Sequence, residues 1–137
     1  MGAIIRGVEY FLTTVHDRPG SAYETLSQLA REEINLLAFG AIPMGPGHTQ
    51  LTLFPESSDR LIRAADKLGM SLLGPNKAFL IQGDDNLGAL VEFHRKLYDA
   101  RINIFASSGV TDGKGGFGYV MYVRPEDHEN AKNVLGI

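Results

Sequence analysis

The 137-residue sequence contains no cysteine and no tryptophan. Without cysteine, the chain cannot form a disulfide bond, a thiolate zinc site, an iron–sulfur cluster or a cysteine nucleophile. It also lacks an excess of positive charge, because 13 lysines and arginines stand against 16 aspartates and glutamates, giving a formal net charge of -3. A protein that depends on phosphate contacts is normally basic, so nucleic acid is not an expected partner.

Long apolar segments are absent as well. No run approaches the roughly 20 residues that a membrane helix requires, and the first residues lack the apolar core of a signal peptide. The four histidines, His16, His48, His94 and His128, do not have the spacing of a metal site. Hydrophobic residues still make up 44% of the chain, which is enough for a folded core. These features predict a cytoplasmic protein with no membrane association, no metal and no cofactor.

An internal repeat appears when the sequence is shifted by 68 residues against itself. Residues 9–57 then align with residues 77–125 with 11 identities. On the order of three identities are expected by chance for chains of ordinary composition. We therefore interpret the chain as a tandem duplication, with a first repeat over residues 1–74 and a second over residues 75–137.

Both repeats have the same predicted order of elements. In the first, a β-rich segment ends at the breaker Asp17-Arg18-Pro19-Gly20, and the next residues have helical apolar spacing. The predicted strands of the first repeat are 8–15, 34–42, 51–54 and 70–73, and its helices are 21–33 and about 61–68. The predicted strands of the second repeat are 77–82, 102–110 and 117–123, and its helices are 87–100 and 125–135.

The order β-α-β-β-α-β predicts an α+β fold made of two tandem ferredoxin-like copies, each with an antiparallel sheet and helices on one face. The second copy has no fourth strand, because the sequence ends after its last helix. The 68-residue shift places Ala3-Ile4-Ile5 at the register of Ser71-Leu72-Leu73. We therefore predict that the N-terminal strand completes the second copy. The alternative is a second copy with three strands.

The face of each sheet without helices is predicted to be apolar and to need a partner. The residues assigned to this face are Tyr10, Leu12, Leu51, Leu53, Leu80 and Met121.

The repeat resembles the ACT domain. The resemblance depends on a strand ending in Asp17-Arg18-Pro19-Gly20, a helix with Leu26 and Leu29, and a next strand opening with Ile34-Asn35-Leu36. The second copy matches more weakly, with Asp85-Asn86-Leu87-Gly88 at the turn and Ile102-Asn103-Ile104 at the strand start. The resemblance covers nearly the whole chain, as two copies with no attached enzyme or DNA-binding domain. It implies a small regulatory module that binds amino acids or similar effectors, usually at interfaces between paired domains.

A ligand site at the strand-to-helix turn also has a physical basis. The first backbone N–H groups of a helix have no internal partner and suit a carboxylate. Glycine at the turn allows close approach, an aspartate can pair with an ammonium, and an asparagine offers both a donor and an acceptor. The predicted ligand-binding residues are Asp17, Arg18, Pro19, Gly20, Ser21, Asn35, Leu36, Asp85, Asn86, Gly88, Asn103 and Ile104.

Purely structural roles for these residues remain open. Asp17 can cap the first helix, Pro19 can set the backbone angle of its first turn, and Asn35 and Asn103 can form turns at strand entries. The glycine-dense segment 113–118 lacks the spacing of a phosphate-binding loop and is predicted to be a hairpin turn.

The sequence as a whole predicts a regulatory protein that binds a small amino-acid-like ligand and does not catalyse a reaction. A homodimer is expected, and an enzyme is a possible partner. The alternative function is a ligand-free interaction module that docks onto an enzyme subunit. A small enzyme ranks third, and would require strongly perturbed titratable groups in one cleft.

Overall fold

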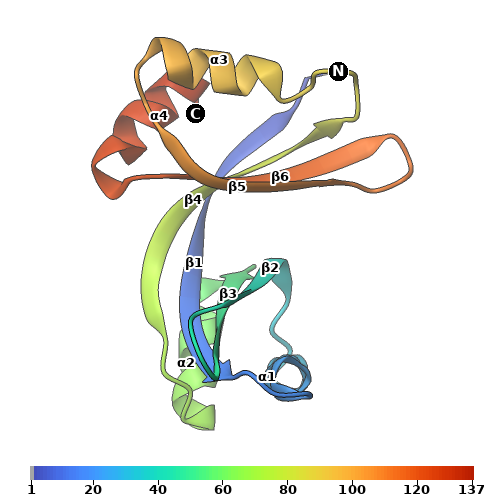
Figure 1. The fold of residues 1–137 in the computed structure, drawn as a ribbon, viewed down its shortest axis with the longest axis vertical. Helices are drawn as coiled ribbons and strands as arrows, with labels where there is room; N and C mark the ends of the chain where they lie inside the picture. Colours follow the sequence, from blue (N-terminus) through green and yellow to red (C-terminus); the bar gives the residue numbers. More distant parts are fainter. Residues whose placement is uncertain (1) are drawn as a thin grey trace. The chain divides into compact units, whose positions relative to one another are not determined.

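The computed structural model describes residues 2–137, so Met1, where the first predicted repeat begins, lies outside the described residues. Figure 1 shows the arrangement of the elements. In chain order they are β1 (Ile4–His16), α1 (Ser21–Arg31), β2 (Leu36–Pro43), β3 (His48–Pro55), α2 (Ser58–Leu68), β4 (Leu73–Asp84), α3 (Val91–Asp99), β5 (Ile104–Thr111), β6 (Gly116–Val123), the 3₁₀ helix η1 (Pro125–Asp127) and α4 (His128–Leu135). Within residues 2–137, no helix is long and apolar enough to span a membrane.

The chain forms two compact units. The first unit is Glu9–Asn76, and the second is Lys77–Ile137 together with the start of the chain up to Val8. The sequence suggests a division into consecutive repeats at residue 74, which stays a prediction. The N-terminal segment, however, groups with the second repeat and not with the first. The long strands β1 and β4 each contribute residues to both units.

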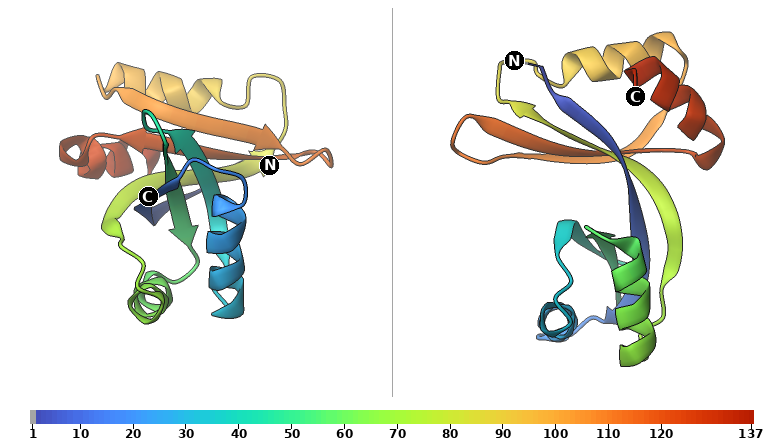
Figure 2. Two further views of the ribbon diagram at one scale, coloured as in Figure 1. Left: turned by 60° about the horizontal axis from the view of Figure 1, so that its bottom comes forward. Right: turned by 180° about the vertical axis from the view of Figure 1, so that it is seen from behind.

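Each unit has the strand order of a ferredoxin-like sheet. The order is β2-β3-β1-β4 in the first unit and β1-β4-β6-β5 in the second. The pairs β1–β3, β2–β3, β4–β6 and β5–β6 are antiparallel. The right view of Figure 2 shows β1 beside β4. The prediction of two ferredoxin-like copies is confirmed.

The N-terminal strand completes the sheet of the second unit. Arg6 Nη2 donates a hydrogen bond to Gln82 Oε1 at 3.1 Å. Ala3 and Ile5 pack against the core of the second unit. A Cβ atom on Gly83 would lie 2.9 Å from Cβ of Ala3, so glycine is needed for this close approach. The N-terminal residues thus supply the missing fourth strand, and the three-strand alternative is wrong.

The core of each unit lies between its sheet and its two helices. In the first unit, Leu29 of α1 and Leu61 of α2 are buried against Phe11, Leu51 and Leu53 of the sheet. The core residues of the second unit are Phe79, Ile81, Leu97, Ile102, Tyr119, Met121, Val123, Ala131 and Leu135. Within each unit the helices contact each other, α1 with α2 and α3 with α4.

This arrangement corrects the assignment of one sheet face. Leu51, Leu53 and Met121 belong to the cores under the helices and not to the uncovered face. The physical reason is the pairing register, in which Phe11 lies opposite Leu53. Opposite residues of an antiparallel pair point to the same face, and neighbours along a strand point to opposite faces. Leu53 therefore shares the face of Phe11 and not that of Tyr10.

The two repeats have the same backbone geometry at the end of their first helix. Glu33 and Arg101, which are 68 residues apart, both have φ of 59° after the first helix of their repeat. The N–H of Ile34 donates to the oxygen of Leu29 at 3.0 Å, and the N–H of Ile102 donates to that of Leu97 at 2.9 Å. Equivalent residues therefore end the two helices in the same way.

The predicted turn at residues 113–118 is a hairpin connection. Asp112 Oδ1 accepts hydrogen bonds from the N–H groups of Lys114 at 2.6 Å and Gly116 at 3.0 Å. These bonds lower the pKa of Asp112, first through Gly116 and then through Lys114. The turn joins β5 to β6, so the hairpin prediction is confirmed.

Candidate functional site

The first strand-to-helix turn is held by backbone bonds. The N–H of Asp17 donates to the oxygen of Gly47 at 2.9 Å, and Ser21 N–H donates to the oxygen of Arg18 at 3.3 Å. Gly20 has φ of 93° and occupies the N-cap position of α1, where no side chain caps the helix. Asp17 is therefore not the cap of α1. The left-handed backbone favours glycine at position 20. Lack of space is not the reason, because a Cβ atom there would meet no atom closer than 3.9 Å.

Around this turn the side chains are exposed, apart from Ser21, which is buried. Arg18 Nη1 donates to Glu24 Oε1 at 3.3 Å, so its guanidinium is held against the first turn of α1. Pro19 and Asp17 are exposed beside it.

The second turn repeats these backbone bonds. The N–H of Asp85 donates to the oxygen of Gly115 at 2.8 Å, and the N–H of Ala89 donates to that of Asn86 at 3.0 Å. The helix itself begins later than the sequence predicts, at Val91 and not at residue 87. Gly88 has φ of +75°, and no side chain caps the helix at its N-cap residue, Leu90. The left-handed glycine interrupts the helical pattern, which delays the start of α3.

The residues of this second turn line a pocket of about 460 Å³ within the second unit, which we call the second-unit pocket. Asp85, Asn86 and Gly88 form one side of it. The start of α3 contributes Leu90 and Val91. The ends of β5 and β6 close the pocket with Gly109, Val110, Thr111, Phe117 and Gly118. Three of the predicted site residues are therefore brought together here.

Glycine in the strands makes room for this pocket. Tyr119 of β6 lies opposite Gly109 of β5, and Phe117 lies opposite Thr111. Because cross-strand partners share a face, Gly109, Thr111 and Phe117 lie on the face that carries the buried Tyr119. In the first copy the residues at the positions of Gly109, Phe117 and Gly118 are Ala41, Thr49 and Gln50. On this face the second copy thus has an aromatic ring, Phe117, in place of Thr49 and a glycine, Gly109, in place of Ala41.

The electrostatics of the pocket combine a negative group with a positive backbone. The side chains of Asp85 and Asn86 are exposed and have no hydrogen-bond partner within residues 2–137. At the start of α3, the N–H groups of Glu92 and Phe93 have no helical acceptor, so this end carries partial positive charge. Asp85 lines the pocket together with Leu90 and Val91, the residues that precede these N–H groups at the start of α3.

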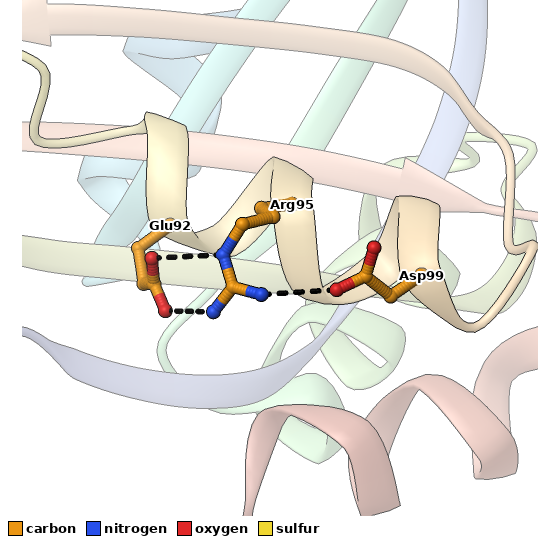
Figure 3. Close-up of polar contacts among 3 residues, drawn as sticks. All are labelled: Glu92, Arg95 and Asp99. Atoms are coloured by element: carbon orange, nitrogen blue, oxygen red, sulfur yellow. Dashed lines mark hydrogen bonds and ion pairs between the residues drawn. The ribbon is translucent and has the colours of Figure 1, made fainter.

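Glu92 lies in the first turn of α3, and its carboxylate pairs with Arg95 of the same helix. Figure 3 shows the ion-paired face of α3, where Arg95 lies between Glu92 and Asp99. Arg95 Nε donates to Glu92 Oε1 at 3.2 Å, and Nη1 donates to Asp99 Oδ2 at 2.9 Å. The hydrogen bond from Arg95 lowers the pKa of Glu92 and keeps it ionised.

The predicted asparagines and their neighbours lie apart from the turns. Asn35 Nδ2 donates to Glu56 Oε2 at 3.2 Å, and its backbone oxygen accepts from the N–H of Glu56 at 2.8 Å. Asn103 precedes β5, about 20 Å along the strand from Gly109 at ordinary strand rise. Leu36 and Ile104 pack against the cores of their units. Within one unit, the structure therefore does not join the asparagines to the turn residues.

Sequence reasoning missed the strand contribution to the pocket, namely Gly109, Thr111, Phe117 and Gly118. The available signal was the pair of glycines inside predicted strands, since glycine in a strand often marks close approach of another group. Within residues 2–137, no group of three or more histidine, aspartate and glutamate side chains is arranged to hold a metal ion.

Comparisons with known proteins bear on the fold. No family model matches the sequence, and no curated protein matches it. Protein BT0572 from Bacteroides thetaiotaomicron has a similar structure, with a TM-score of 0.80, 17% identity, and coverage of 96% of this chain and 88% of that one. The ligand-free regulatory subunit of aspartate kinase from Thermus thermophilus is also similar, with a TM-score of 0.68, 15% identity, and coverage of 99% and 95%. The chain has a tandem ACT fold.

A larger protein contains the same tandem ACT fold as one part. Escherichia coli aspartokinase III, solved in complex with lysine and aspartate, matches with a TM-score of 0.52 and 18% identity. The match covers 99% of this chain and 32% of that protein. The tandem ACT fold is therefore found both in a separate regulatory subunit and within a longer kinase chain.

Proposed function

We propose that this protein binds a small amino-acid-like ligand in the second-unit pocket and acts by binding and not by catalysis. The observation that carries the proposal is that one pocket is lined both by Asp85 and by Leu90 and Val91, which lie at the uncapped start of α3. A zwitterionic amino acid has the complementary charges: its ammonium suits Asp85, and its carboxylate suits the helix start. Phe117, Val110 and Leu90 offer apolar contact to its side chain.

A regulatory role is supported by the structural comparisons. The similar Thermus protein is a regulatory subunit of a kinase, and the similar E. coli kinase was solved with two amino acids. We therefore propose that ligand binding alters the association of this protein with itself or with an enzyme. Such coupling requires that the ligand bind one state more tightly than the other. A homodimer and an enzyme partner are both part of the proposal.

The test is a calorimetric and thermal-shift screen of the full chain against the twenty amino acids. A ligand at 100 times its Kd adds about 2.7 kcal/mol to stability, which raises Tm by several degrees. Asp85→Asn, which removes the charge at constant shape, should weaken binding at least tenfold. The matched control is Asp17→Asn, because Asp17 makes the same backbone bond in the first copy but does not line the second-unit pocket. Equal weakening by both variants, or no binding of any amino acid, would overturn the proposal.

A ligand-free docking module is the second candidate function. It is favoured by exposed apolar side chains on the second turn and α3: Leu87 is fully exposed, Val91 is 64% exposed and Tyr98 is 78% exposed. Light scattering measures the mass of the wild type and of the double variant Leu87→Ser, Tyr98→Ser in solution, and so shows whether each one self-associates or is a monomer. Loss of association in this variant, with no response to any amino acid, would favour the docking module.

A further inference from the structure

A second pocket, of about 530 Å³, lies within the first unit, and we call it the first-unit pocket. It is bounded by residues 12–15 of β1, by α1 and by residues 68–73, which follow α2. None of its lining residues lines the second-unit pocket. It is therefore separate from the site of the proposed function.

The two copies have different residues at this place. In the second unit, Ala3 approaches Gly83 so closely that a Cβ atom on the glycine would lie 2.9 Å from Cβ of Ala3. The equivalent residues in the first unit, 68 positions away, are Ser71 and Val15. Val15 has a branched side chain where Gly83 has none, and both Val15 and Ser71 line the first-unit pocket. β4 begins only at Leu73, and the segment before it leaves a space beside β1.

The lining of the first-unit pocket is polar but uncharged. It contains no aspartate, glutamate, lysine, arginine or histidine. Its hydrogen-bonding side chains are Thr13, Thr14, Thr25, Gln28, Gln50 and Ser71. Burial of a charged ligand here would leave that charge without a partner, which is costly. The pocket therefore suits a neutral ligand that can both donate and accept hydrogen bonds.

The hydroxyl groups of two largely buried threonines support a ligand at this place. Thr13 is 8% exposed and Thr25 is 7% exposed, and both line the first-unit pocket. Neither side chain has a hydrogen-bond partner within residues 2–137. Among the described residues, the buried side-chain nitrogen and oxygen atoms that lack a hydrogen-bond partner are those of His128, so the two threonine hydroxyls are not sealed off from the pocket. Their hydroxyls are thus available to a group in the pocket.

The backbone of β1 adds peptide groups to the same space. Asn76 Nδ2 donates to the oxygen of Tyr10 at 3.4 Å, so Tyr10 directs its peptide oxygen away from β3. Every second residue of an antiparallel strand directs its N–H and C=O to the same side. Thr14 therefore presents its peptide groups to the edge where the pocket lies. Ser71 and Leu72 line the pocket beyond the first residue of β4, Leu73.

We propose that the first-unit pocket is a second binding site and that it takes an uncharged amide, in the form of a capped amino acid or a short extended peptide segment. An amide group offers one donor and one acceptor. These match the hydroxyls of Thr13 and Thr25 and the peptide groups of Thr14. Leu12, Val15 and Met70 provide the apolar contact for a side chain. A free amino acid is excluded by its two charges and belongs to the second-unit pocket.

The experiment is an NMR titration of the isotope-labelled full chain with N-acetyl-leucine amide, with the capped peptide acetyl-Ala-Leu-Ala-amide, and with free leucine. Either capped compound should shift the backbone resonances of Thr13, Thr25 and Gln28, and free leucine should not. If the capped peptide binds more tightly than N-acetyl-leucine amide, the natural ligand is an extended peptide segment. If the two compounds bind equally, the ligand is a small amide. Absence of shifts with both capped compounds, or equal shifts with free leucine, would overturn the proposal.

Matched variants make the test specific. Thr25→Val keeps the shape but removes one hydroxyl, so binding of the capped amide should weaken about fivefold. Thr52→Val is the control, because Thr52 lies on β3 outside the pocket lining. Ser71→Leu should block binding by filling the space, and a retained Tm for each variant shows that the fold is intact. Asp85→Asn should leave binding of the capped amide to the first-unit pocket unchanged. Loss of amino-acid binding in the second-unit pocket is therefore distinguished from loss of binding in the first-unit pocket. Equal weakening by Thr25→Val and Thr52→Val would also reject the proposal.

Discussion

Gly109 lies directly against the ring of Tyr119: a Cβ atom on Gly109 would be 3.0 Å from Cδ1 of the tyrosine. The tyrosine is fixed from its other end, because Tyr119 Oη and His94 Nε2 form a hydrogen bond of 2.6 Å. The missing side chain at position 109 thus allows β5 to pair with β6 beside a fixed aromatic ring. This pairing forms one wall of the second-unit pocket.

Gly109→Ala is expected to destabilise the protein by about 1–2 kcal/mol, because the fixed Tyr119 ring must move to admit the added methyl group. Equilibrium denaturation in urea measures this change. Gly118→Ala is the matched control, since a Cβ atom there would meet nothing within 4 Å. The control should change stability by less than about 0.5 kcal/mol. Equal losses of stability in Gly109→Ala and Gly118→Ala would show that the contact with the Tyr119 ring is not what disfavours a side chain at position 109.

Ile5→Ala tests the completion of the second unit by the N-terminal strand. Ile5 packs against the core of this unit, whereas its neighbour Ile4 is 68% exposed. We expect Ile5→Ala to cost about 1.5 kcal/mol, with faster amide exchange in β4. Ile4→Ala should cost less than about 0.5 kcal/mol. A similar small cost for both, measured by denaturation, would contradict the role given to this strand.

His128 predicts a pH dependence of stability. The side chain is 7% exposed, stacks on Phe79 at a ring-centroid distance of 4.8 Å, and both ring nitrogens lack a hydrogen-bond partner within residues 2–137. Burial lowers the pKa of His128 below its ordinary 6.5, nearby Lys77 and Lys132 lower it further, and Glu129 acts in the opposite direction. The folded state therefore binds the proton less tightly than the unfolded state.

The stability linked to His128 is fully present above pH 6.5 and is lost as pH falls from there through the lowered pKa of the folded state. His128→Phe keeps an aromatic ring on Phe79 and removes the titration. Urea denaturation between pH 7.5 and pH 5 should show a steeper loss of stability in the wild type than in this variant. Parallel pH profiles would show that His128 does not contribute.

Ser57→Ala tests the start of α2. The side-chain oxygen of Ser57 accepts a hydrogen bond from the N–H of Arg60 at 3.3 Å, so Ser57 caps the helix. Its replacement should cost about 1 kcal/mol. Asp17→Ala, at the turn before α1 where no side chain caps the helix, should cost less than about 0.5 kcal/mol. Denaturation of both variants distinguishes the two turns, and a larger cost at Asp17 would contradict the capping assignment.

Local sequence signals predicted most of the elements. The breaker Asp17-Arg18-Pro19-Gly20 marks the start of α1, and the alternation of apolar residues marks the strands. They failed at α3, where the apolar pattern continues through Leu87 but the left-handed Gly88 delays the helix. They also failed for Leu51 and Leu53, because face assignment depends on register, and register is a long-range property.

The candidate site was predicted in part. Asp85, Asn86 and Gly88 line the second-unit pocket, as expected for one ligand-binding turn, whereas Asn103 lies at the far end of β5. The strand residues Gly109 and Phe117 were missed, since their closeness to the turn arises only when β5 and β6 pair beneath the start of α3. Ligand binding by the turn residues stays a prediction.

By itself, the sequence determined the duplication, the element order and the ferredoxin-like fold of each copy, because turn residues and apolar periodicity act over a few neighbouring positions. Tertiary structure decided which side chains meet. Ala3 packs closely against Gly83, and the equivalent Ser71 and Val15 line the first-unit pocket. The physical reason is that close packing depends on the volumes of groups that lie far apart in the chain, which local sequence signals do not determine.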